Sequence, residues 1–127
     1  MMLTLLGLTA CAQNSSQEKT TEEITYRQIS QSEAKKMMET EKDFIILDVR
    51  TQEEFDEKHI ENAILIPDYE IEQKAEKMLP DKDRMILVYC RSGRRSKNAS
   101  QKLAQMGYTN VYEFGGINTW QYGTVTE

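Results

Sequence analysis

The sequence is poor in the side chains that form disulfides and structural metal sites. Its 127 residues include two cysteines and one histidine. Two cysteines allow at most one disulfide, so the chain is not a disulfide-rich scaffold. Three such side chains do not make a closed set of zinc ligands, and we expect neither a metal site nor a cofactor. The histidine, His59, lies in a charged run, which favours a surface or helix-capping position over a place in a Ser–His–Asp triad.

Long apolar runs are also missing outside the first residues. After Cys11 no apolar stretch approaches the ~20 residues that a membrane-spanning helix needs. Hydrophobic residues make up 39% of the chain and charged residues 29%, which is typical of a soluble globular protein. The length fits one domain with an apolar core of its own.

Positive charge is scarce overall but concentrated in one segment. The chain has 16 basic and 21 acidic residues, a net charge of −5. Residues 90–112 contain five of the basic residues and no acid, so this segment carries +5 and the remainder −10. We expect the chain to repel polyanions, nucleic acid included, and to attract a small anion at this segment. The five residues are Arg91, Arg94, Arg95, Lys97 and Lys102.

Residues 1–23 are predicted to be a leader followed by a flexible tether. Residues 1–10 are apolar and uncharged, which is the general form of a secretory leader. The sequence from Leu8 to Cys11 resembles the lipobox of bacterial lipoproteins, although no basic residue precedes it. Such a cysteine carries two acyl chains, which anchor stably, so the resemblance implies membrane attachment at the cell envelope. The alternative is a disordered tail with an incidental cysteine, and then a cytoplasmic protein.

Residues 24–127 are predicted to form one α/β domain, because strand-like and helix-like segments alternate. This alternation favours a parallel sheet with helices on both faces. Strands are expected at 24–26, 44–49, 63–66, 85–89 and 111–114, and helices near 30–38, 51–55, 70–79, 96–106 and around Trp120. Ligands of such sheets bind beyond the carboxyl ends of the strands. Asp48 and Arg50 follow one strand and Cys90 another, so we expect them to be neighbours.

Cys90 begins a tight loop between a strand and a helix. Backbone N–H groups, the positive end of the helix and nearby arginines all favour the thiolate, which is the nucleophile. Gly93 lets the backbone turn, and Ser96 is expected to cap the helix. The same cradle suits a sulfur oxyanion or a phosphate. The alternative is an inert, buried cysteine at the end of a core strand. No second cysteine lies nearby, which excludes a thioredoxin-type dithiol.

Three blocks of the sequence together resemble the rhodanese family of sulfurtransferases. They are residues 47–55 with 59–63 and 66–67, residues 88–96, and Gly115-Gly116-Ile117 with Trp120. Their order and spacing are similar to a single rhodanese domain over about residues 24–123. The resemblance implies a three-layer α/β/α fold around a central, mainly parallel five-stranded sheet, and a monomeric protein.

The resemblance also implies a reaction. Cys90 would take the outer sulfur of an anionic donor such as thiosulfate, become a persulfide, and pass the sulfur to cyanide or a thiol. Asp48 and Arg50 would brace the loop, and Arg95 matches the family's loop arginine. The charged sulfur species would be held by the loop residues Arg91, Ser92, Gly93, Arg94, Arg95 and Ser96.

Two other functions remain open for the Cys90 loop. Cysteine-dependent phosphatases and arsenate reductases have an arginine six positions after the cysteine. Here that position is Ser96, and the arginine, Arg95, comes one position earlier. The shorter spacing favours sulfur transfer. The second alternative is a non-catalytic module that carries a persulfide to a partner, because the same cysteine serves both roles.

Overall fold

The computed structural model describes residues 26–126. The predicted leader, the tether and the lipidation site Cys11 lie outside the described residues and stay predictions. Within residues 26–126, no helix combines the length and the apolar character that crossing a bilayer requires.

The centre of the fold is a five-stranded sheet in the order β1-β5-β4-β2-β3. Every pair of neighbouring strands is parallel. This confirms the predicted α/β class and the number of strands. The strands are β1 (Tyr26–Gln28), β2 (Phe44–Asp48), β3 (Ile64–Leu65), β4 (Met85–Cys90) and β5 (Val111–Gly116).

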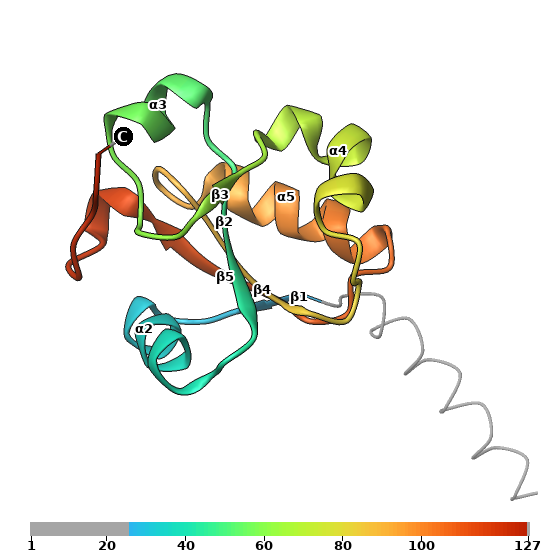
Figure 1. Cartoon of the computed structure of the whole chain (residues 1–127), viewed down its shortest axis with the longest axis horizontal. Coiled ribbons are helices and arrows are strands. Elements are labelled where there is room, and N and C mark those ends of the chain that lie inside the picture. Colours follow the sequence, from blue (N-terminus) through green and yellow to red (C-terminus); the bar gives the residue numbers. More distant parts are fainter. Residues whose placement is uncertain (1–25, 127) are drawn as a thin grey trace, which may run out of the picture.

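Helices cover both faces of the sheet and complete the three layers. Figure 1 shows α2 (Gln31–Thr40) on one face, and α4 (Ile71–Met78) and α5 (Arg94–Gln105) together on the other. The short helix α3 (Gln52–Glu57) follows β2. Single 3-10 turns span Asp68–Glu70 and Ile117–Thr119.

Local sequence signals set several helix ends. Capping boxes join Ser30 to Glu33 at the start of α2 and Thr51 to Glu54 at the start of α3, and each follows a Ser/Thr-x-x-Glu pattern in the sequence. Gly107 follows the last turn of α5 with φ of +101°, a left-handed conformation that ends the helix where its expected range, 96–106, ends.

Side chains of β4 alternate between two apolar clusters, one on each face. Ile86, Val88 and Cys90 belong to the cluster beneath α4 and α5, whereas Leu87 and Tyr89 belong to the cluster on the α2 face. All five are at most 1% exposed. Since successive side chains of a strand point to opposite faces, this alternation directs Cys90 towards α5.

The start of α5 differs from the prediction. The helix begins at Arg94, so Ser96 lies inside its first turn, and the N-cap is Gly93 without a side-chain cap. The prediction that Ser96 caps the helix is therefore wrong. The predicted final helix is a three-residue 3-10 turn, which Trp120 directly follows.

His59 is buried, so the prediction of a surface position is wrong. Its ring stacks on Phe55 with 3.8 Å between ring centroids, and its backbone pairs with Val125 near the C-terminus. Only 5% of the residue is exposed. Its Nδ1 lies 2.8 Å from the carbonyl oxygen of Phe55 in α3, a helix-capping type of contact.

Candidate active site

The carboxyl ends of β2 and β4 lie side by side, as the sequence predicts. Asp48 is the register partner of Tyr89, the residue before Cys90. The backbone N–H of Val49 also donates to the carbonyl oxygen of Tyr89 at 3.1 Å. The structure therefore brings the Asp48–Arg50 segment and the Cys90 loop to one edge of the sheet.

The Cys90 sulfur sits inside its own loop. The residue is 1% exposed. The backbone N–H of Gly93 donates to Sγ at 3.0 Å, and the hydroxyl oxygen of Ser96 lies 3.4 Å from Sγ. A backbone N–H aimed at sulfur stabilises negative charge on that atom. The arrangement suits a thiolate or a charged sulfur species on Cys90.

Two glycine positions let the loop close over the end of β5. Gly93 has φ of +110°, a conformation that side chains disfavour. A Cβ on Gly116 would lie 2.0 Å from the carbonyl oxygen of Arg91, so the loop rests directly on this residue. The N–H of Asn118 then donates to the same carbonyl at 3.1 Å. The Gly115-Gly116 block therefore supports the loop.

The three loop arginines differ in their partners. Arg95 is half-buried and makes two hydrogen bonds to the Glu54 carboxylate, at 2.9 and 3.0 Å. Arg91 and Arg94 are exposed, and no carboxylate within the described part of the chain pairs with either. The positive charge open to an anion is therefore that of Arg91 and Arg94. Ser92 is exposed as well, whereas Gly93 and Ser96 are buried.

Glu54 is a site residue that the sequence reading missed. Its carboxylate accepts from Arg95 and from the backbone N–H and hydroxyl of Thr51. The Arg95 hydrogen bonds, and then those of Thr51, lower the pKa of Glu54 to about 2. In the sequence, Glu54 completes a Thr-x-x-Glu capping pattern that begins at Thr51, and this pattern says nothing of its second partner.

Asp48 and Arg50 form a closed, buried ion pair. Nε and Nη2 of Arg50 donate to the Asp48 carboxylate at 2.9 and 2.7 Å, and Nη2 also donates to the Lys58 carbonyl at 2.7 Å. Burial alone would lower the pKa of Arg50, but Asp48 outweighs it and raises that pKa. The pair contacts Tyr89, the residue before Cys90, and makes no hydrogen bond to residues 91–96. The role of Asp48 and Arg50 in bracing the loop therefore stays a prediction.

Tyr89 completes this network. Its hydroxyl donates to Asp48 at 2.6 Å and accepts from the backbone N–H of Ile60 at 3.0 Å. Burial, followed by the charge of Asp48, raises the pKa of Tyr89, which keeps its hydroxyl a donor. The network ties the ends of β2 and β4 to the segment that leads into β3.

Glu113 is the second residue that sequence reasoning missed. It is 2% exposed in β5, and its Oε2 accepts from the Ser96 hydroxyl at 2.5 Å and from the Gly115 N–H at 2.9 Å. It comes directly after the acid-free segment 90–112, but nothing in that position indicates contact with the loop. A buried carboxylate thus lies one hydroxyl away from Cys90.

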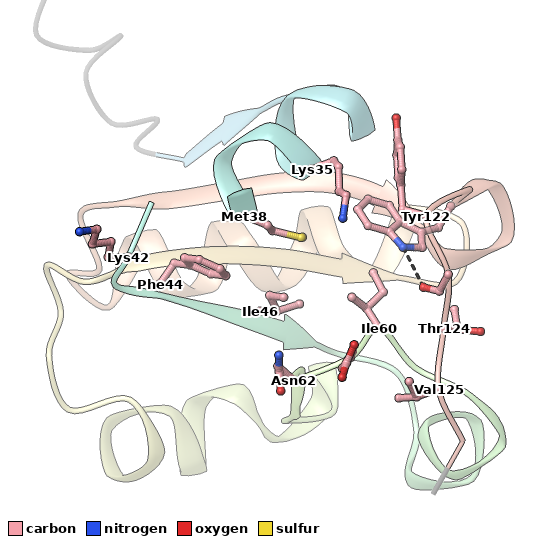
Figure 2. A pocket seen from close by; sticks show the side chains of 13 residues that line it. Lys35, Met38, Lys42, Phe44, Ile46, Ile60, Asn62, Tyr122, Thr124 and Val125 are labelled. Atoms are coloured by element: carbon pink, nitrogen blue, oxygen red, sulfur yellow. Dashed lines mark hydrogen bonds between the residues drawn. The ribbon is translucent and has the colours of Figure 1, made fainter. Parts of the chain in front are cut away.

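A cavity of about 470 Å³ lies on the α2 face and not at Cys90. Figure 2 shows it between α2, β2 and the C-terminal segment. None of the Cys90 loop residues lines it. No group of three metal-ligating side chains occurs within residues 26–126 either. The residues of the cavity wall include Lys35, Met38, Phe44, Ile46, Trp120 and Tyr122.

Comparison with known proteins yields matches over most of the domain. The family described as Rhodanese-like domain matches residues 30–122. Thiosulfate sulfurtransferase GlpE of Coxiella burnetii is 37% identical over 99 residues, covering 77% of this chain and 90% of the relative. Thiosulfate sulfurtransferase PspE of Escherichia coli is 39% identical over 71 residues, covering 56% and 68%.

The architecture matches a solved structure as well. A rhodanese-related protein from Thermoplasma volcanium superposes with a TM-score of 0.69 and 33% sequence identity. The match covers 80% of this chain and all of the other.

Proposed function

Because the chain belongs to the family of rhodanese-like domains and is a rhodanese-type sulfurtransferase, we propose that Cys90 transfers sulfur from thiosulfate through a persulfide. The observation that carries this proposal is the environment of Sγ. It accepts from the Gly93 N–H in a loop whose Arg91 and Arg94 are exposed and, among the described residues, pair with no carboxylate. The donor is thiosulfate because both named relatives are thiosulfate sulfurtransferases.

The first half of the reaction loads Cys90. The thiolate forms a bond to the outer sulfur of thiosulfate, the sulfur–sulfur bond of the donor breaks, and sulfite leaves with the electron pair. The negative charge that began on Sγ ends on the outer sulfur of the persulfide. Arg91 and Arg94 raise the local concentration of the dianionic donor. The Gly93 N–H stabilises the charged sulfur.

The second half of the reaction transfers the sulfur from the Cys90 persulfide to an acceptor. A thiol or cyanide attacks the outer sulfur of the persulfide, the bond to Cys90 breaks, and Cys90 leaves as a thiolate. With a thiol acceptor, the thiol proton goes to the solvent or to the newly formed persulfide. The enzyme is thus modified and restored in separate steps, for which ping-pong kinetics are expected.

The residue six positions after Cys90 favours sulfur transfer over phosphate chemistry. Ser96 is fully buried, and its hydroxyl donates to Glu113. Arg95, one position earlier, is engaged by Glu54. The position where a cysteine-dependent phosphatase holds an arginine against its substrate is thus filled by a small side chain with other partners.

The test is turnover of thiosulfate with cyanide, read as thiocyanate formation, by the wild type and by Cys90→Ala. We expect turnover by the wild type and only background formation by the variant, with the melting temperature kept as the control for folding. Thiosulfate alone should add the mass of one sulfur atom to the wild type at Cys90. No thiocyanate but Cys90-dependent hydrolysis of aryl phosphates would refute the proposal. A persulfide without turnover would identify a carrier.

A further inference from the structure

Cys90 and Glu113 are joined through one hydroxyl group. The Ser96 oxygen lies 3.4 Å from the Cys90 sulfur and 2.5 Å from Oε2 of Glu113. The three residues are 1%, 0% and 2% exposed, respectively. They come from the end of β4, the first turn of α5 and the middle of β5. The persulfide reaction described above uses neither Ser96 nor Glu113 for any proton.

The Ser96 hydroxyl has a single proton, so only one neighbour accepts it at a time. With Glu113 ionised, the hydroxyl donates to the carboxylate, and its oxygen accepts from the Cys90 thiol. With Cys90 ionised, the direction reverses: a protonated Glu113 donates to Ser96, and Ser96 donates to sulfur. In both arrangements, every hydrogen-bond donor among Cys90, Ser96 and Glu113 has an acceptor. The two arrangements differ only in which end holds the negative charge.

The surroundings favour one negative charge on this pair rather than two. Within residues 26–126, no basic side chain pairs with Glu113, and besides the Ser96 hydroxyl its carboxylate accepts from the neutral N–H of Gly115. Gln31 of α2, which lies beside Gly115, is also neutral. The Glu54 hydrogen bonds, and to a lesser extent the charge of Cys90, raise the pKa of Arg95, whose guanidinium is paired with the Glu54 carboxylate. Two anions separated by one hydroxyl in a buried site repel each other strongly.

We propose that Glu113 is a positioning residue that receives the Cys90 proton through Ser96 and thereby prepares the nucleophile. The S–H bond of Cys90 breaks as a new O–H bond forms on Ser96, while the original Ser96 proton passes to Oε2 of Glu113. One negative charge moves from carboxylate to sulfur, and no proton leaves the protein. The inference rests on the proposed role of Cys90 as the nucleophile.

The pH dependence of Cys90 alkylation by iodoacetamide tests this relay. Peptide mass spectrometry on the full chain separates Cys90 from Cys11. The relay predicts that the Cys90–Glu113 pair of the wild type keeps one of its two protons over a range of pH. We therefore expect the rate to rise to a plateau and to rise again when the second proton leaves. Glu113→Gln keeps the size of the side chain and an oxygen acceptor for Ser96. Its profile should show a single rise without a plateau.

Glu54→Gln is the matched control, because it removes a carboxylate near the loop that has no hydroxyl bridge to sulfur. Its profile should keep two steps, although their midpoints shift. A wild-type profile with one step, or a Glu113→Gln profile that superimposes on that of the wild type, would overturn the relay. Either result would make the Ser96–Glu113 hydrogen bond a structural contact between α5 and β5.

Infrared difference spectra of the wild type give a second measurement that needs no variant to fold. At the pH of the plateau, alkylation removes the charge from sulfur, so Glu113 should ionise and a buried carboxyl band should disappear. Retention of all carboxyl bands would contradict the relay. Both measurements work without a sulfur donor. A two-step profile in a chain that forms no thiocyanate would therefore refute the proposed function and leave the relay standing.

Discussion

Two polar clusters at the same edge of the sheet differ in how completely their groups are paired. At the end of β2, Asp48, Arg50 and Tyr89 form a closed network in which each charged group meets its counterpart. At the end of β4, the Cys90 loop keeps Arg91 and Arg94 open to solvent. Asp48 and Arg50 are at most 3% exposed.

At this edge of the sheet, the closed network at the end of β2 is suited to structural support, and the open Cys90 loop is suited to reaction with a substrate. A closed network gives no partner to an incoming anion, and its burial makes it costly to disturb. An open cluster has charge and a nucleophile left over for a substrate. We therefore expect changes at β2 to act first on stability and changes around the loop to act first on sulfur transfer.

The largest effect is expected for Asp48→Ala. The change leaves the Arg50 guanidinium buried without its counter-charge, which costs about 3–5 kcal/mol of unfolding free energy. Urea denaturation measures it. The double variant Asp48→Leu with Arg50→Met removes both charges and should recover much of the loss. If Asp48→Ala were as stable as the wild type, the expected difference between a stabilising cluster at β2 and a reactive cluster at β4 would be contradicted.

Gly116→Ala should affect both stability and sulfur transfer. The added Cβ would meet the Arg91 carbonyl, so the loop must move, at a cost of about 1–3 kcal/mol. Displacement of the loop should reduce thiocyanate formation by up to about 10²-fold. Gly123→Ala is the control, because it adds the same methyl group where nothing lies within 4 Å of the Cβ, at a backbone φ of +99° that a side chain disfavours. That variant should lose some stability and keep its rate of sulfur transfer.

The smallest effect is expected for Glu54→Gln, and it depends on pH. The folded pKa of about 2 lies below the ordinary value of 4.5, so folding favours the carboxylate. Its stabilisation is complete above pH 4.5 and disappears as pH falls through about 2. The partly exposed pair contributes at most about 1 kcal/mol at neutral pH.

Urea denaturation at a series of pH values from 7 downwards checks this prediction. The stabilities of Glu54→Gln and the wild type should converge towards acid. The exposed neighbour Glu53 provides the control Glu53→Gln, for which no such convergence is expected. A gap between Glu54→Gln and the wild type that widens towards acid would contradict the sign of the shift.

Features that depend on nearby residues could be predicted from the sequence. The apolar runs of β2 and β4, the capping boxes at Ser30 and Thr51, and the stop at Gly107 each lie within a few positions. The position of Cys90 beside the Asp48 segment followed from the topology of parallel sheets. These signals were sufficient for the α/β fold and for the place of the candidate site.

Contacts between distant residues could not be predicted in the same way. Glu54 and Arg95 are 41 positions apart, and Ser96 and Glu113 are 17 apart. Strand register and helix placement bring these pairs together, and neither leaves a spacing pattern in one sequence. The burial of His59 likewise depends on the distant Val125. The sequence therefore indicated Cys90 as the nucleophile but not the two carboxylates that bind its loop, Glu54 and Glu113.

The contact between Gly116 and the Arg91 carbonyl also limits how the loop can be redesigned. Inserting one residue after Cys90 would create the longer spacing of a phosphate cradle, but the Arg91 carbonyl already occupies the space beside Gly116. A longer loop must therefore leave the end of β5 or reshape it. Directed evolution that varies residues 91–96 alone would sample few viable loops. Libraries that also vary residues 115–118 would let the loop and the segment beneath it change together.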